Sequence, residues 1–273
     1  MEKTYVQNKL EQIKREGYGL HLEGVLSNAF DIHKKSILPG LVASLLYVLV
    51  MMVVGLAMFG TVYGMSISEF MEVFKRNPQA INASMESVSF TSKILSALVS
   101  AIVGALLMPL LSGLYKVAFH TQFGVNGSTS DLFAYYKGAS FTNIFIYTFI
   151  YTFVLQFLNL GLEQVIPGVG GFIGVLIQII LSVTFILTVP FIVFGNMNWI
   201  EALKSSTLVT SKNWFFLLLI LGIAFIIVMI GIFFCGIGIL FTYPFMYFVT
   251  FVLYDKIIGF PNANDDISKI GEL

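Results

Sequence analysis

Long apolar stretches separated by short polar ones dominate the chain. Runs without a charged residue extend over 36–68, 94–115, 138–162, 164–200 and 213–254. About 20 mostly apolar residues are needed for a helix to cross the hydrocarbon core of a bilayer, so the last run is long enough for two helices. The pattern predicts an all-α membrane protein with six transmembrane helices, at roughly 38–63, 94–118, 143–162, 171–195, 214–235 and 238–256.

The polar segments before the first and the fifth predicted spans share one pattern. The segment that begins at Glu23 aligns with the one that begins at Glu201, and Lys34 then matches Lys212. Each segment places apolar residues on one side of a helix and charged residues on the other, as helices in the membrane interface do. The residues predicted to anchor these two helices are Phe30, Lys34, Trp199, Glu201, Lys204 and Trp214.

The second, fourth and sixth predicted spans each carry a proline, namely Pro109, Pro190 and Pro244. Proline removes a backbone donor and bends a helix. A weaker third copy of the polar segment begins at Ser130, before the third span. The sequence therefore predicts three pseudo-repeated hairpins, each preceded by an amphipathic interfacial helix and each with a return span bent at proline. A chance match between short apolar segments is the alternative.

The basic residues are unevenly placed around the predicted spans. If the N-terminus lies inside, the cytoplasmic segments hold 12 of the 15 Lys and Arg residues, which is the bias that orients membrane proteins. Both termini are therefore predicted to be cytoplasmic. The chain is predicted to consist of a cytoplasmic N-terminal segment with an amphipathic helix (1–36), a six-helix membrane domain (37–260) and a cytoplasmic C-terminal tail (261–273).

Composition supports the membrane assignment. Hydrophobic residues make up 57% of the chain and charged residues 11%, whereas soluble domains carry about 25% charged residues. The net charge is zero and no dense basic tract follows a nucleic-acid backbone, so no nucleic-acid partner is expected. The expected partners are membrane lipids, with another membrane protein or a second copy of the chain as further candidates.

The second half contains a series of short motifs in a fixed order: a proline-ended span, an amphipathic helix, an apolar hairpin with a further proline, and a closing Tyr-Asp pair. The residues that form these motifs are Pro190, Glu201, Lys204, Ser206, Pro244, Tyr254 and Asp255. This order resembles that of bacterial six-span membrane proteins related to the membrane domain of glycerophosphoryl diester phosphodiesterases. The resemblance implies a six-span fold in the bacterial cytoplasmic (inner) membrane. It implies little about function, because most members have no assigned activity.

The sequence lacks the usual marks of catalysis. His21, His33 and His120 show no paired spacing and no HExxH motif, so interfacial packing is favoured over a metal site. No G-x-S-x-G elbow is present, and the centres of the predicted spans carry no ionisable residue that would indicate ion coupling. We expect no enzyme activity, no cofactor and no metal.

Uncharged polar residues form stripes on the third and fourth predicted spans, and a carboxylate lies at the outer end of the third. Such stripes form contacts between helices; the alternative is that they line a cavity for a polar headgroup or a small solute. The candidate lining residues are Thr152, Gln156, Asn159, Glu163, Gln178 and Ser182.

Two functions follow from these features. The favoured one is a non-enzymatic scaffold, assembly or accessory subunit of the membrane. The alternative is a transporter or a lipid- or amphiphile-handling protein with a cavity in the central hairpin, which internal repeats and proline-interrupted helices favour.

Overall fold

The computed structural model describes residues 3–63, 66–76, 88–233 and 236–261, and all regular structure in them is helical. Six segments are long and apolar enough to cross a membrane, which confirms the prediction of an all-α chain with six candidate spans. Apart from its first residue, the predicted tail 261–273 lies outside the described residues. The six segments are Ile37–Gly60, Phe90–Gln122, Gly138–Val165, Gly170–Val193, Trp214–Phe233 and Gly238–Ile257.

Three of the spans are built from two consecutive helices. The helices that form the six spans are α3 (Ile37–Tyr63), α6 (Phe90–Gln122), α7 (Gly138–Val165), α8 (Gly170–Thr184) with α9 (Thr188–Val193), α11 (Trp214–Ile230) with the 3-10 helix η2 (Gly231–Phe233), and α12 (Gly238–Thr242) with α13 (Phe245–Ile257).

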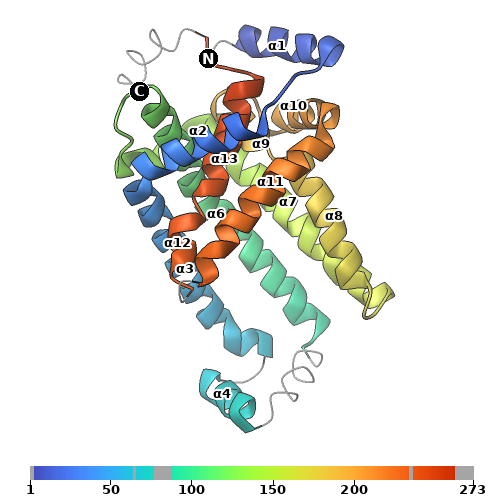
Figure 1. Ribbon diagram of the computed structural model, residues 1–273. Coiled ribbons are helices and arrows are strands. Elements are labelled where there is room, and N and C mark those ends of the chain that lie inside the picture. The colour runs from blue at the N-terminus through green and yellow to red at the C-terminus, as the bar shows by residue number, and fades with distance from the viewer. Residues whose placement is uncertain (1–2, 64–65, 77–87, 234–235, 262–273) are drawn as a thin grey trace.

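Shorter helices lie at the two ends of the bundle (Figure 1). One end, called here the collar end, carries α1, α2 and α10. The opposite end, called the loop end, carries α4 and the turn between α7 and α8. The bounds of these four helices are Lys3–Glu16 for α1, Leu22–Lys35 for α2, Ile67–Arg76 for α4 and Trp199–Lys212 for α10.

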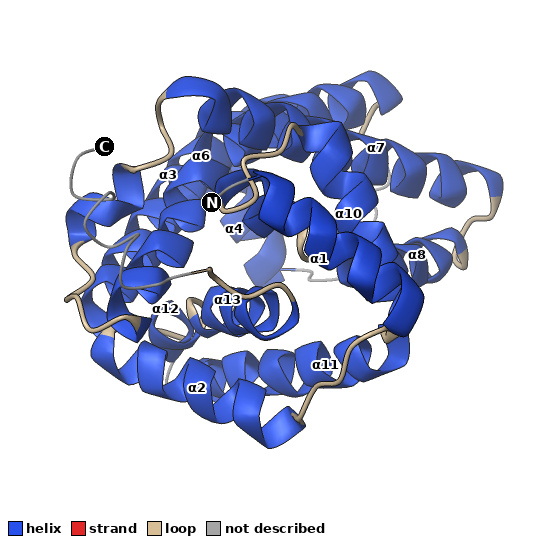
Figure 2. Ribbon diagram, turned by 90° about the horizontal axis from the view of Figure 1, so that it is seen from above, coloured by secondary structure: helices blue, strands red, loops and turns tan. Residues whose placement is uncertain are grey.

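Helix α1 was not predicted as a separate element. Figure 2 shows it lying across the collar end beside α10. Its Val6 and Ile13 are almost completely buried, and the Tyr5 hydroxyl donates a hydrogen bond of 3.0 Å to the carbonyl of Ile258, just after α13. These apolar residues lie seven apart, on one side of a helix, so α1 ties the N-terminus to two distant parts of the chain.

Two of the three prolines coincide with breaks in a span. Helix α8 ends at Thr184, and Pro190 lies in the first turn of α9. Pro244 precedes the first residue of α13, directly after α12. Pro109, by contrast, lies within the continuous helix α6. Because proline lacks an N–H and displaces the carbonyl four residues earlier, it leaves backbone groups that need other partners.

Helix α10 supplies partners for two backbone groups at the α8–α9 break, the carbonyl of Thr184 and the N–H of Leu187. The Ser206 hydroxyl donates to the carbonyl of Thr184 at 2.9 Å and accepts from the N–H of Leu187 at 3.2 Å. The Thr210 hydroxyl donates to the same carbonyl at 3.0 Å, and the Trp214 indole N–H donates to the Thr184 hydroxyl at 3.3 Å. Buried backbone groups must be paired, so the break depends on side chains of α10 and α11.

The segments before the hairpins pack in a cyclic order. The 3-10 helix η1 (Thr129–Phe133), which precedes the second hairpin, contacts α6 of the first. Helix α10, before the third hairpin, contacts α9 of the second, and α2, before the first, contacts α13 of the third. Three related units arranged around an axis would give this order, although the repeat itself remains a prediction.

The third copy differs from the prediction, because η1 is a five-residue 3-10 helix where an amphipathic α-helix was expected. Asp131 and Ser128 form a capping box that fixes its first turn. The backbone of Leu132 lies directly against Gly113 of α6, where a Cβ atom on Gly113 would overlap it. This close approach brings η1 onto α6 in place of an interfacial helix.

The apolar stripe of α2 faces protein more than was expected. Val25 and Ala29 are buried, and the Phe30 ring packs on Phe245 of α13 with ring centroids 4.6 Å apart. The His33 ring contacts the same phenylalanine edge-on at 5.8 Å. Its Nδ1 atom is buried and has no hydrogen-bond partner among the described residues.

Acidification is expected to loosen the contact between α2 and α13. Burial lowers the pKa of His33 from its ordinary value near 6.5. The unfolded chain therefore binds a proton at a higher pH than the folded chain, and stability is lost as the pH falls from about 6.5 towards the lower folded-state pKa. The melting temperature of purified protein between pH 8 and pH 5 measures this effect. His33→Gln should make the melting temperature less dependent on pH. His21→Gln, a change at an exposed residue, should leave the pH dependence as it is in wild type.

Candidate functional site

A cavity of about 440 Å³ lies inside the bundle. Residues of α3, α6 and α7, of the region around the α8–α9 break and of the region around the α12–α13 break form its wall. Its most distinctive feature is a set of tyrosines from four of these regions. They are Tyr47, Tyr115, Tyr147, Tyr151, Tyr243 and Tyr247.

The tyrosine rings contact one another across the helices. Tyr47 of α3 stacks on Tyr243 with ring centroids 6.1 Å apart, and Tyr115 of α6 lies 5.8 Å from Tyr247. The hydroxyls of Tyr243 and Tyr247 are 3.3 Å apart, because these residues follow each other at a spacing of four across the α12–α13 break. Tyr147 and Tyr151 on α7 have the same spacing of four, and their rings stack with centroids 5.7 Å apart. The result is an aromatic wall that carries hydroxyl groups.

Several other polar groups of the wall have no partner in the described part of the chain. The Ser100 hydroxyl of α6 donates to Oε1 of Gln156 on α7 at 3.0 Å, while no hydrogen bond joins Gln156 Nε2 to a described residue. The Thr148 hydroxyl is buried and equally unpaired. Because buried polar groups are costly to leave unpaired, the cavity calls for a molecule that supplies hydrogen-bonding atoms.

The wall is uncharged. Among the described residues that line the cavity, none is an aspartate, glutamate, lysine, arginine or histidine. Methionine, leucine, isoleucine, valine and phenylalanine side chains alternate with the hydroxyl and amide groups. Pockets for small molecules combine apolar walls with a few polar groups in this way.

The collar end of the bundle is closed by aromatic packing. Phe194 contacts Phe251, Tyr254 and Phe260 at ring-centroid distances between 5.1 and 5.8 Å, and Phe251 and Tyr254 are completely buried. On another span, α7, residues towards the loop end are exposed, such as Phe157 at 52%.

Three of the six candidate lining residues lie in the cavity wall: Thr152, Gln156 and Ser182. The other three lie elsewhere. Asn159 packs on Gly174 of α8, where a Cβ atom would collide with its side chain. Glu163 accepts hydrogen bonds from the N–H groups of Gly168 and Gly171 at 3.1 and 2.8 Å, so it holds the turn between α7 and α8.

Gln178 is exposed on α8, between Gly174 and Ser182 on the same side of the helix. No hydrogen bond joins its amide to a described residue. The cavity also differs in place from the one expected, because all the hairpins contribute to it and not the central hairpin alone.

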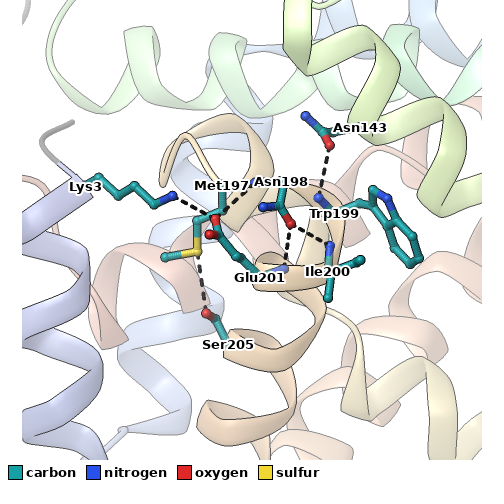
Figure 3. Close-up of polar contacts among 8 residues, drawn as sticks. All are labelled: Lys3, Asn143, Met197, Asn198, Trp199, Ile200, Glu201 and Ser205. Carbon is teal, nitrogen blue, oxygen red and sulfur yellow. Dashed lines mark hydrogen bonds and ion pairs between the residues drawn. The ribbon is translucent and has the colours of Figure 1, made fainter.

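Two of the predicted anchoring residues, Trp199 and Glu201, form polar contacts at the start of α10 (Figure 3). Asn198 caps α10 by accepting from the N–H groups of Ile200 and Glu201 at 3.1 and 3.0 Å. Glu201 in turn accepts from the ammonium of Lys3 at 2.9 Å, and this hydrogen bond lowers the pKa of its carboxyl. The backbone N–H of Trp199 donates to Oδ1 of Asn143 on α7 at 3.1 Å.

The remaining anchoring residues have separate positions. Trp214 binds the α8–α9 break and Phe30 packs on α13, as described above. Lys204 is exposed, and Lys34 forms an exposed ion pair of 3.6 Å with Asp31. The position of these residues at a membrane interface remains a prediction.

One pair of polar residues escaped the sequence reasoning. His120 Nδ1 of α6 lies 3.0 Å from Oδ2 of Asp131 in η1, and both side chains are largely buried. The same carboxylate oxygen accepts from the N–H of Ser128 at 2.9 Å. The pair thus fixes η1 on α6. Within the described ranges no group of three or more histidine, cysteine, aspartate or glutamate side chains could hold a metal ion.

Six segments that are long and apolar enough to cross a membrane indicate a multi-pass membrane protein by length and composition. Comparison with known proteins finds no matching family model, no matching curated protein and no matching solved structure. The resemblance to phosphodiesterase membrane domains therefore stays a prediction, and function is argued from the cavity.

Proposed function

We propose that the protein is a non-enzymatic protein of the bacterial cytoplasmic membrane that binds a membrane-dissolved amphiphile in the tyrosine-lined cavity. The observation that carries this proposal is a mostly apolar wall with polar groups that no described residue pairs: the buried Thr148 Oγ1, and Gln156 Nε2, whose amide is bonded only through Oε1, to Ser100. An amphiphile that reaches the cavity from lipid would bring both an apolar tail and hydrogen-bonding atoms.

Binding is a better description than ion-coupled transport. Proton and ion pathways through membranes use ionisable residues, and the described wall contains none. Passage to the collar end would also require the packed rings around Phe194 to separate. With the collar end placed in the cytoplasm, as the basic residues favour, the amphiphile would enter from the outer side or laterally.

A scaffold or accessory role is the second candidate, and Gln178 favours it. This amide is exposed on a helix whose other exposed residues, apart from Ser182, are apolar. An unpaired amide in hydrocarbon is unfavourable, whereas the same amide between two helices forms a hydrogen bond. Another membrane protein or a second copy of the chain could supply the partner.

Substitution of the two glutamines separates the two candidates. Gln156→Leu removes the amide in the cavity wall, and Gln178→Leu makes the same change outside it. Native mass spectrometry of the purified protein should show a bound amphiphile whose occupancy falls about fivefold in Gln156→Leu, the loss expected for one hydrogen bond. Gln178→Leu should retain the amphiphile.

Two results would count against amphiphile binding. The first is a wild-type protein that carries no amphiphile in any membrane lipid extract. The second is equal occupancy in wild type and Gln156→Leu. Loss of a co-purifying membrane protein or of a dimer in Gln178→Leu alone would support the accessory role instead.

A further inference from the structure

The geometry points to a ligand with an uncharged, oxygen-rich head, of the neutral glyceride type, and against phospholipids. This inference rests on the proposed function and concerns the chemistry of the same cavity. Three observations carry it: the depth of the cavity, the absence of charge in its described wall, and the kind of polar groups left unpaired.

The cavity lies at the middle of the spans. Tyr151 is at the midpoint of the span Gly138–Val165, and Tyr247 is at the midpoint of Gly238–Ile257; both line the cavity. Ser182, a third lining residue, is at the midpoint of the span that α8 and α9 form. A head bound here is therefore held at the depth where the bilayer is least polar.

A phosphate at this depth would have no counter-charge. The described wall offers neutral hydroxyl and amide groups but no lysine or arginine. Moving an ionised group to the membrane centre without a partner is strongly unfavourable. The cavity should therefore bind a phosphate-bearing lipid at least about 100-fold more weakly than the same lipid without phosphate.

A cationic head is also disfavoured, even though tyrosine rings can bind cations through their faces. In two of the tyrosine pairs, the face of one ring packs against the face of the other. Tyr47 and Tyr243 stack with 24° between the ring planes, and Tyr147 and Tyr151 with 22°. Each pair covers one face of each ring, so these four rings do not form an open cage around a cation.

The polar groups of the wall that lack a described partner can all donate a hydrogen bond, so a ligand with acceptor atoms would pair them. Gln156 Nε2 can only donate, and the Thr148, Tyr47 and Tyr151 hydroxyls donate or accept; none of them bonds a described residue. The ester carbonyls and the hydroxyl of a glyceride supply such atoms. Met51, Met108 and Met246 line the same space, and flexible methionine side chains adapt to acyl chains.

A matched set of three photoactivatable probes tests this inference with the full chain in nanodiscs. The probes are diacylglycerol with a diazirine acyl chain, phosphatidic acid with the same chains, and an alkyl trimethylammonium with the same diazirine chain. After irradiation, labelled peptides are identified by mass spectrometry, and unlabelled lipid is added as competitor. We expect diacylglycerol to label peptides that contain Gln156 or Thr148, and phosphatidic acid to label them at least about 100-fold less effectively.

Equal or stronger labelling of these peptides by phosphatidic acid or by the cationic probe overturns the inference but leaves amphiphile binding standing. Absence of cavity labelling by every probe overturns both. A variant adds an independent readout: Gln156→Lys places a positive charge in the wall and should shift labelling from diacylglycerol to phosphatidic acid. The wild-type comparison decides the question even if this variant does not fold.

Discussion

Gly113→Ala is expected to destabilise the protein by about 3 kcal/mol or more. A Cβ atom at this position of α6 would overlap the backbone of Leu132 in η1. Backbone atoms cannot move aside as the end of a flexible side chain can, and Leu132 is completely buried. The substitution should therefore push η1 away from α6 and weaken the bond between His120 and Asp131 that joins the same two elements. The midpoint of unfolding in detergent micelles measures the loss.

Gly104→Ala is the matched control, because Gly104 lies on the same helix and an added Cβ atom meets no atom within 4 Å. Alanine is a better helix former than glycine, so this variant should be as stable as wild type or slightly more stable. Equal stability of Gly113→Ala and wild type would show that η1 does not pack on α6 at this distance.

The spans could be predicted from the sequence because lipid imposes a simple demand on composition and length. The details that depend on packing could not. The residues of α1 that pack at the collar end, such as Val6, belong to a segment that is polar overall, so its tertiary contacts are visible only in the structure. Likewise Ser130 begins a segment that resembles the other copies, yet the segment forms a 3-10 helix whose Leu132 backbone lies against Gly113.

In the candidate site, too, residue type could be read from the sequence, whereas the contacts of each residue could not. Polar stripes on two apolar spans included Thr152, Gln156 and Ser182, which line the cavity. Asn159 and Glu163 belong to the same chemical classes but satisfy contacts within the hairpin, and a sequence does not distinguish these cases. The tyrosines were missed because aromatic residues are common in spans. The spacing of four residues between Tyr147 and Tyr151, repeated at Tyr243 and Tyr247, was the available signal.

Ser206→Ala is expected to lower the free energy of unfolding by about 2–3 kcal/mol. The substitution leaves the N–H of Leu187 without an acceptor and removes one of the two hydroxyl donors from the carbonyl of Thr184. Both groups lie at the α8–α9 break, where the helix provides no replacement, and Leu187 is completely buried. Chemical or thermal unfolding in micelles measures the effect.

Ser205→Ala is the control, since it makes the same change one residue earlier. Among the described residues, the Ser205 hydroxyl bonds only the sulfur of Met197, at 3.5 Å, and sulfur is a weak acceptor. A change below about 0.5 kcal/mol is therefore expected. The difference between the two variants reaches beyond stability. Phe185 and Val189, at the break that Ser206 holds, line the cavity, so Ser206→Ala should also weaken amphiphile binding while Ser205→Ala should not. If Ser206→Ala lowered stability but left binding unchanged, the break would support the fold without shaping the cavity.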